Sequence, residues 1–202
     1  MFRCGSRSLE VICAILLLPL GLVAQVAPGP LVDTGQTVVE GRQLNYRIRN
    51  LPVSSFPDLP GPIADAVNAR GCLIPQTYQA RRPENVIHGS LEKAGSTDWA
   101  VLCSAGGQVS LLVFFESGSP SSPMVLAKRP ATESLQPHAG STELGFDWGI
   151  DPASPKRIHE AQAAMSHRPT PPDHDCIADS IIDQKTVYRL FKDGEWVKVD
   201  VD

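Results

Sequence analysis

The chain alternates short apolar segments with turns rich in glycine and proline. Apolar and polar residues alternate over residues 44–49, and this period of two predicts a strand with one buried face. Residues 97–104 and 108–116 are strongly apolar, and the Ala-Gly-Gly between them predicts a hairpin. We expect a second hairpin over residues 186–201, around Asp193-Gly194, and weaker strands over residues 85–91 and 124–128.

Two short helices are also expected. In the segment 54–72, Pro60 and Pro62 suit a first helical turn and Gly71 is a left-handed stop. The buried face of this helix is expected to hold Ile63, Ala66 and Val67. A second helix begins at Ser154, a capping residue, and Pro155. Its apolar face holds Ile158, Ala161 and Met165, and the proline-rich residues 167–175 end it.

Strands arranged in hairpins, with two peripheral helices, predict an α+β fold with an antiparallel sheet. Residues 25–37 are rich in Pro and Gly and are expected to be a flexible lead. Residues 131–150 are expected to be irregular, with Phe146 and Trp148 available for packing. Residues 38–202 then form a single globular domain of ordinary size.

The first two dozen residues have the pattern of a secretory signal peptide. Arg3 and Arg7 precede an apolar run over residues 11–23, which is short for a membrane span of about 20 residues. We predict cleavage near Ala24, so residues 1–24 are a signal peptide and the mature protein is secreted or periplasmic. An uncleaved N-terminal anchor is the alternative. We expect no membrane span in the mature chain.

Charge and cysteine content agree with an exported protein. The formal net charge is −4, and an acidic chain is a poor candidate for nucleic-acid binding, which depends on basic patches. Cys72, Cys103 and Cys176 remain after cleavage. In an oxidising compartment we expect a Cys72–Cys103 disulfide, with Cys176 left over or paired between chains. The alternative is three buried free thiols.

Residues 89–102 (GSLEKAGSTDWAVL) and 171–182 (PPDHDCIADSII) resemble two degenerate FG-GAP/VCBS-type units, in which a loop leads into a strand and a hairpin. The first segment keeps Gly89, Gly95 and Asp98 of the pattern. In that family the loops bind calcium and the strands build propeller blades. The resemblance implies a calcium site at Asp173, Asp175 and Asp179, although an acidic surface turn accounts for the same residues.

The whole chain also resembles short exported bacterial proteins of unknown function, through the segments GCLIPQ, ENVIHG and DWAVLCS. That resemblance implies a compartment and no activity. G-x-S-x-G, P-loop and C-x-x-C motifs do not occur in the sequence.

One cluster of chemically capable residues remains. His167, Asp173, His174 and Asp175 lie within nine residues, and imidazole with carboxylate can hold zinc or act as acid and base. We favour a solvated loop as the explanation of these residue types. His88, in a weak strand beside Gly89, is expected to be a structural histidine.

These patterns favour a non-enzymatic binding module, without a cofactor, whose partner is an unknown protein or a cell-envelope component. We expect exposed aromatic residues such as Trp148 and Trp196 to contribute to its surface. The first alternative is a hydrolase or metal-dependent enzyme that uses the cluster at residues 167–175. The second is a structural domain stabilised by calcium.

Overall fold

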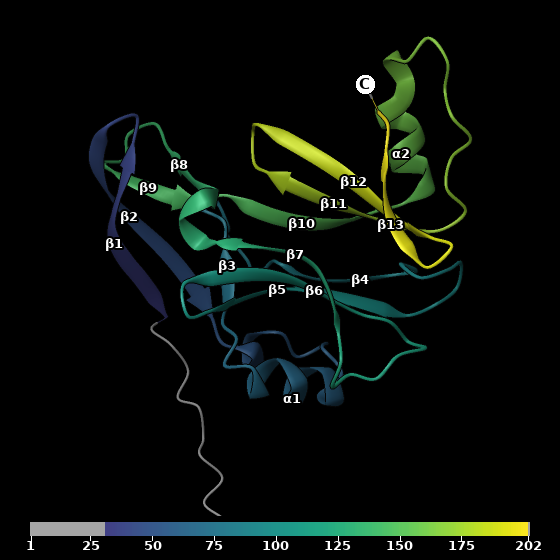
Figure 1. Ribbon diagram of the computed structural model, residues 1–202, viewed down its shortest axis with the longest axis horizontal. Helices are drawn as coiled ribbons and strands as arrows, with labels where there is room; N and C mark the ends of the chain where they lie inside the picture. The colour runs from purple at the N-terminus through teal and green to yellow at the C-terminus, as the bar shows by residue number, and fades with distance from the viewer. Residues whose placement is uncertain (1–30, 202) are drawn as a thin grey trace, which may run out of the picture.

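The computed structural model describes residues 31–201, which form three β-sheets (Figure 1). The N-terminal sheet contains β1 (Val32–Val39), β2 (Arg42–Leu51), β3 (Ile74–Gln76), β8 (Leu135–Pro137) and β9 (Glu143–Phe146). The middle sheet contains β4 (Val86–Gly89), β5 (Asp98–Ala105), β6 (Gln108–Phe114) and β7 (Met124–Pro130). The C-terminal sheet contains β10 (Trp148–Ala153), β11 (Cys176–Ile181), β12 (Lys185–Lys192) and β13 (Glu195–Val199). The helices are α1 (Gly61–Ala69) and α2 (Pro155–Ala161), with 3-10 turns at Val53–Ser55, Ala131–Ser134 and Gln162–Ala164.

The predicted α+β class is wrong, because the described chain is mostly β. Strands account for 47% of it and helices for 15%, and the strands form three sheets instead of one. Residues 32–37 of the expected flexible lead lie in β1, which pairs with β2 along its whole length. Much of the segment 131–150, expected to be irregular, forms β8, β9 and the start of β10.

The other predicted elements are present. The expected hairpins correspond to β5–β6 and β12–β13, and Asp193 and Gly194 both have positive φ in the second turn. Helix α1 buries Ile63, Ala66 and Val67 as predicted. The side chain of Ser154 accepts a hydrogen bond from the Arg157 N–H and caps α2. The predicted signal peptide, residues 1–24, and residues 25–30 of the lead lie outside the described residues.

The middle and C-terminal sheets share one connectivity, in which four strands follow one another as an antiparallel meander. Their first strands, β4 and β10, contact each other. Asn85, buried and in a left-handed conformation just before β4, donates to the Trp148 carbonyl and accepts from the Ile150 N–H. This amide therefore joins the two sheets, in a conformation that asparagine tolerates better than most residues.

The central strands of the middle sheet, β5 and β6, are buried on both faces, which explains why their sequence is the most apolar part of the described chain. Alternate residues of β5 and β6, such as Leu102 and Leu111, face a core shared with the other two sheets. The opposite face, including Val101 and Leu112, packs against α1. Figure 1 shows α1 on one side of this sheet and the C-terminal sheet on the other. Burial of both faces replaces the polar–apolar alternation of a half-buried strand with a continuous apolar run.

The predicted disulfide between Cys72 and Cys103 is present and joins the segment that follows α1 to β5. Cys176 is a buried free cysteine at the start of β11. Burial raises the pKa of its thiol to about 12, so Cys176 stays protonated and behaves as a small apolar side chain.

Candidate functional site

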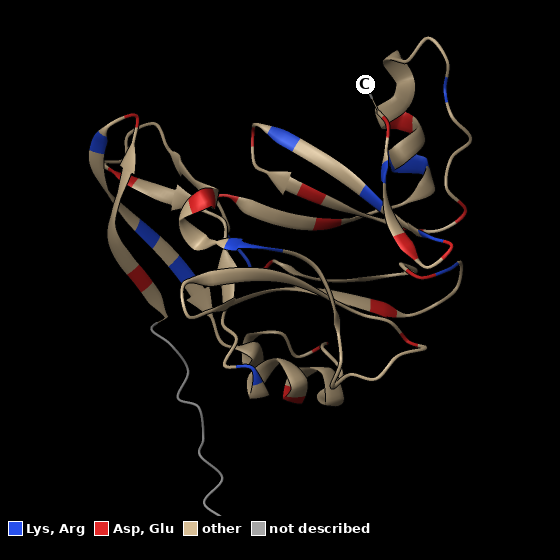
Figure 2. Ribbon diagram, in the orientation of Figure 1, with Lys and Arg blue, Asp and Glu red and all other residues tan. Residues whose placement is uncertain are grey.

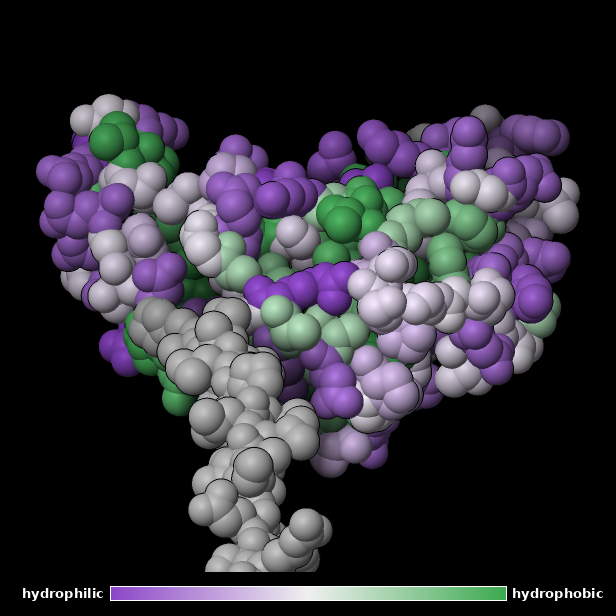
Figure 3. Space-filling view, turned by 60° about the horizontal axis from the view of Figure 1, so that its bottom comes forward, coloured by the Kyte–Doolittle hydropathy of each residue, from purple (hydrophilic) through white to green (hydrophobic). Residues whose placement is uncertain are grey.

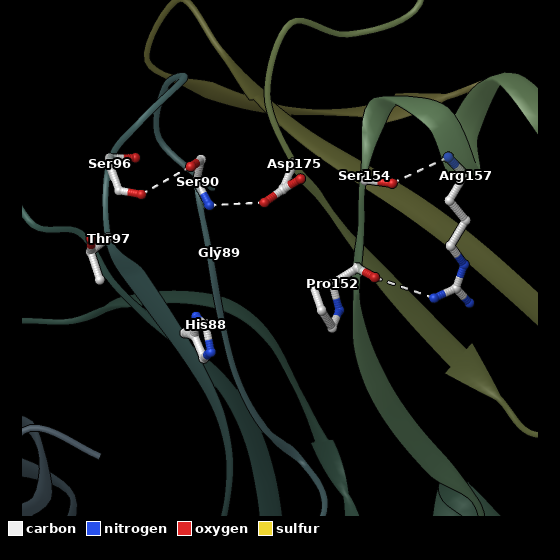
Figure 4. Close-up of a pocket in the computed structure, with 9 residues that line it drawn as sticks. All are labelled: His88, Gly89, Ser90, Ser96, Thr97, Pro152, Ser154, Arg157 and Asp175. Carbon is white, nitrogen blue, oxygen red and sulfur yellow. Dashed lines mark hydrogen bonds between the residues drawn. The ribbon is translucent and has the colours of Figure 1, made fainter. Parts of the chain in front are cut away.

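A cleft of about 450 Å³ opens where β4 of the middle sheet meets β10 of the C-terminal sheet (Figure 4). We call it the junction cleft. Its lining consists mainly of polar residues from three places: the end of β4 with the following loop, the segment from β10 into α2, and the residue before β11. These residues are His88, Gly89, Ser90, Ser96, Thr97, Pro152, Ser154, Arg157 and Asp175.

The two segments that resemble FG-GAP/VCBS-type loops, residues 89–102 and 171–182, meet in this cleft. The backbone N–H of Asp175 donates to the Ser90 carbonyl at 3.0 Å, and the Ser90 N–H donates to Asp175 Oδ2 at 3.0 Å. A Cβ at Gly89 would lie 2.9 Å from the same carboxylate oxygen, so the glycine makes this close approach possible. The sheets are therefore joined at one wall of the cleft by a reciprocal pair of hydrogen bonds.

A second aspartate shapes the loop that forms this wall. Asp98 is fully buried, and its carboxylate accepts hydrogen bonds from the N–H groups of Leu91 and Glu92 and from Ser96 Oγ. Those three bonds are made to Oδ2, and Oδ1 accepts from the Glu116 N–H at 2.8 Å. Four donors within the protein therefore satisfy the carboxylate, and they fix the loop that carries Ser90, Ser96 and Thr97.

The opposite wall carries a cation. Arg157, in the first turn of α2, donates from Nη1 to the Pro152 carbonyl at 3.2 Å, which places its guanidinium along the end of β10 (Figure 4). Arg157 is exposed and makes no ion pair within 4.0 Å with any residue from 31 to 201. Its remaining N–H groups are hence available to a ligand. His88 also lines the cleft, and its ring centroid lies 5.1 Å from that of Trp99.

The predicted His/Asp cluster is only partly brought together. His174 is 8% exposed, and its two ring nitrogens contact Asp173 Oδ1 at 2.7 Å and the Phe191 carbonyl at 2.9 Å. The hydrogen bond from His174 lowers the pKa of the Asp173 carboxyl. Asp175 is bound to Ser90 instead, and His167 is exposed on the preceding loop. With both nitrogens engaged, His174 connects its loop to β12 and has no free nitrogen for proton transfer in this geometry.

The aspartates of the predicted calcium site, Asp173, Asp175 and Asp179, have three separate sets of partners. Asp179 accepts hydrogen bonds from Trp148 Nε1 at 2.7 Å and from Arg189 at 2.8 Å. Between residues 31 and 201 the structure places no group of three or more His, Cys, Asp or Glu side chains where they could hold a metal ion. Calcium prefers six to eight oxygen ligands, and the described geometry of these aspartates does not provide such a cage.

The prediction that Trp148 is exposed is wrong, since its side chain has 0% exposure. The guanidinium of Arg129, on β7, lies 3.7 Å from the Trp148 ring centroid and also contacts Asp179 at 3.4 Å. These contacts join the middle and C-terminal sheets through residues that do not line the junction cleft. Trp196 is partly exposed, and its Nε1 donates to the sulfur of Met124.

Arg157, Ser90 and Thr97 were not predicted as site residues from the sequence. Only the cap at Ser154 gave a local signal near Arg157, and it predicted a helix start and no binding role. The face shown in Figure 3 is largely hydrophilic or neutral, with apolar residues in small groups. Within residues 31–201, the helices are too short or too polar to cross a membrane. No family model, curated protein or solved structure matches the chain.

Proposed function

We propose that the protein is an extracytoplasmic, non-enzymatic binding module, and that its junction cleft binds a carbohydrate of the cell envelope. The compartment rests on the signal-peptide pattern of residues 1–24 and on the Cys72–Cys103 disulfide, a bond that persists in oxidising compartments. The ligand class rests on the chemistry of the cleft.

The observation that carries the proposal is the balance of donors, acceptors and charge in the cleft. Arg157 offers N–H donors, the carboxylate of Asp175 offers an acceptor, and Thr97 offers a hydroxyl that can do either. The single positive charge of Arg157 and the single negative charge of Asp175 cancel. Sugar hydroxyls both donate and accept, so a neutral carbohydrate matches this lining better than an ion of either sign.

The same residues favour binding over glycoside hydrolysis. Glycosidases typically use two carboxyl groups, about 5 to 9.5 Å apart, on either side of the bond to be cleaved. Among the nine described residues that line the junction cleft, Asp175 alone has a carboxylate. Oδ2 of this carboxylate already accepts the Ser90 N–H, which lies in the wall of the cleft. A bound sugar would therefore meet hydrogen-bonding groups without a second carboxyl group among these lining residues.

The test is carbohydrate binding by residues 25–202, first on a glycan array that includes peptidoglycan fragments and then by isothermal titration calorimetry. Arg157→Gln removes a charge-assisted donor and should weaken binding about tenfold. Lys156→Gln is the matched control, because Lys156 is the adjacent residue of α2, is 86% exposed and pairs with Glu160. The control should bind as the native protein does.

Two results would contradict this function. One is the absence of any carbohydrate ligand, or equal affinity in the native protein and Arg157→Gln. The other is release of new reducing ends from the bound glycan, which would show hydrolysis. The calcium alternative has a separate test, because a calcium-stabilised domain would melt at a higher temperature with millimolar calcium than with a chelator.

A further inference from the structure

A second cleft, which shares no lining residue with the junction cleft, lies on the N-terminal sheet. Its volume is about 260 Å³. We call it the arginine cleft, because two arginines of β2 line it together with residues of β3, β9 and the loop after β3. The residues that matter for its chemistry are Arg47, Arg49, Gln76, Tyr78 and Glu143.

Tyr78 forms a fixed, exposed aromatic wall. Its N–H donates to the Phe146 carbonyl at 2.7 Å, and its ring stacks on His138 with centroids 3.8 Å apart and planes within 10°. At Gly145 a Cβ would meet the Tyr78 side chain at 2.5 to 2.7 Å, so the ring occupies the space that any other residue would fill. Tyr78 is nevertheless 49% exposed. One part of the side chain is packed while the rest stays open to solvent.

His138 in turn contacts Asp147, with its Nε2 2.9 Å from Asp147 Oδ2, and both side chains are largely buried. Burial raises the pKa of the Asp147 carboxyl, while the neighbouring His138 lowers it. The wall of the cleft is therefore a stack in which Asp147 contacts His138, His138 contacts Tyr78, and Tyr78 covers Gly145. Such support keeps an aromatic surface in place before a ligand arrives.

The two arginines lie beside this wall with their charges uncompensated. Figure 2 shows basic positions that follow one another along β2. Arg47 and Arg49 are two residues apart in this strand, and alternate residues of a strand project from the same face. Neither has a carboxylate within 4.0 Å in the described part of the chain. Arg49 donates to the Ala80 carbonyl at 2.7 Å, which holds the adjoining loop that carries the exposed Arg81 and Arg82.

This concentration of arginine stands out in a chain whose net charge is −4. Glu143 is the acidic residue that lines the cleft, so the lining carries two positive charges and one negative charge. Guanidinium groups bind carboxylate and phosphate oxygens through paired hydrogen bonds. The faces of aromatic rings suit the flat, C–H-bearing side of a sugar or another ring.

We propose that the arginine cleft binds an oxyanion attached to a ring, with the carboxylate or phosphate at Arg47 and Arg49 and the ring against Tyr78. This site is independent of the junction cleft and does not rest on the function proposed for it. A uronic acid and a sugar phosphate share the required chemistry and differ in the anion.

The experiment titrates residues 25–202 with three probes, galacturonate, galactose 1-phosphate and neutral galactose, and follows backbone amide shifts by NMR. At least one of the two anions should shift amides of β2 and of residues 76–80 at millimolar concentration, whereas galactose should not. The anion that binds more tightly identifies the source of the oxyanion. Added salt should weaken this binding, because the arginines are exposed.

Variants assign the binding to the cleft. Arg47→Gln and Arg49→Gln should each weaken binding of the anion about tenfold. Arg42→Gln is the matched control, because Arg42 is an exposed arginine at the other end of β2 that does not line the cleft. Arg157→Gln should also leave anion binding unchanged, which separates this site from the junction cleft. Absence of anion binding, equal shifts of the β2 and 76–80 amides with galactose, or native affinity in both cleft variants would overturn the proposal.

Discussion

Replacing Asp179 with asparagine tests how much a buried carboxylate stabilises the C-terminal sheet and its contact with Arg129 of the middle sheet. Asp179 is 5% exposed, and its carboxylate accepts from Trp148 Nε1, Arg189 and Arg129. Asparagine has nearly the same shape and keeps one oxygen for the Trp148 N–H. The substitution removes the negative charge and directs an NH₂ group toward donors, which leaves part of the guanidinium bonding unsatisfied.

The expected cost follows from the geometry. The 2.8 Å contact with Arg189 is a charge-assisted hydrogen bond, of the kind that contributes about 1.5 to 3 kcal/mol, and the 3.4 Å contact with Arg129 adds less. Breaking a fully buried ion pair costs about 3 to 5 kcal/mol. Here the arginine side chains are 25% and 22% exposed, so water can replace part of what is lost. We therefore expect a loss of about 2 to 3 kcal/mol in the free energy of unfolding.

The assay is urea unfolding of the native protein, Asp179→Asn and a control, followed by tryptophan fluorescence. The control is Asp193→Asn, which makes the same change in the turn between β12 and β13. Asp193 has a φ of 52°, which asparagine tolerates, so its stability should change by less than about 0.5 kcal/mol. An equally small change for Asp179→Asn would show that the charge of this carboxylate does not stabilise the fold.

Three further predictions concern the sulfur atoms and the buried histidine–aspartate pair. Replacing Cys72 and Cys103 with alanine should lower stability to urea by about 3.7 kcal/mol, from the chain entropy of a loop closed over 31 residues, and an unchanged unfolding midpoint would contradict this. Cys176, whose pKa burial raises to about 12, should resist iodoacetamide at pH 8 until the protein unfolds, as intact mass can show; rapid labelling of the native protein would refute this. Because burial raises the pKa of Asp147, its contribution to stability is fully present below about pH 3.8 and is lost as pH rises through the raised pKa. The stability of Asp147→Asn relative to the native protein should therefore increase over that window in urea unfolding, and a constant difference would contradict the assignment, with His138→Gln separating the contribution of its partner.

Local sequence patterns were sufficient to predict helix α1 and the β12–β13 hairpin. Helix α1 follows from its prolines, its apolar spacing and the positive φ of Gly71, all of which act within a few residues. The β12–β13 hairpin follows in the same way from Asp193-Gly194. Strand β1 was missed because it lies at an edge of its sheet and mixes Gly, Thr and Gln with valine. Its composition does not indicate a strand, and its extended conformation depends on pairing with β2.

The fold class was missed for a related reason. Strands β8 and β9 are three and four residues long, too short for an alternating pattern to be recognised. Their pairing is tertiary, because β9 lies parallel to β2, about a hundred residues earlier in the chain. Once these strands form a separate sheet with β1, β2 and β3, the single antiparallel sheet expected from hairpins is excluded.

The candidate sites were the least predictable part. Both segments with the loop-and-hairpin resemblance contribute to the junction cleft, but the aspartates in them bind backbone N–H groups and arginine side chains within the protein. Arg157 lies in the same cleft as those segments because the fold brings β4 and β10 into contact. An exposed arginine in the first turn of a helix has no pattern that marks it for binding, so its role depends on what the fold places opposite it.

The most direct test of the account is an amide-shift map of isotope-labelled residues 25–202, titrated with the carbohydrate that binds best on the array. The account predicts saturable shifts at the N–H groups of Ser90, Thr97 and Arg157, with no comparable change at Arg47 or Arg49. Saturable shifts confined to other parts of the molecule, with Ser90 and Arg157 unmoved, would show that the junction cleft is not the binding site.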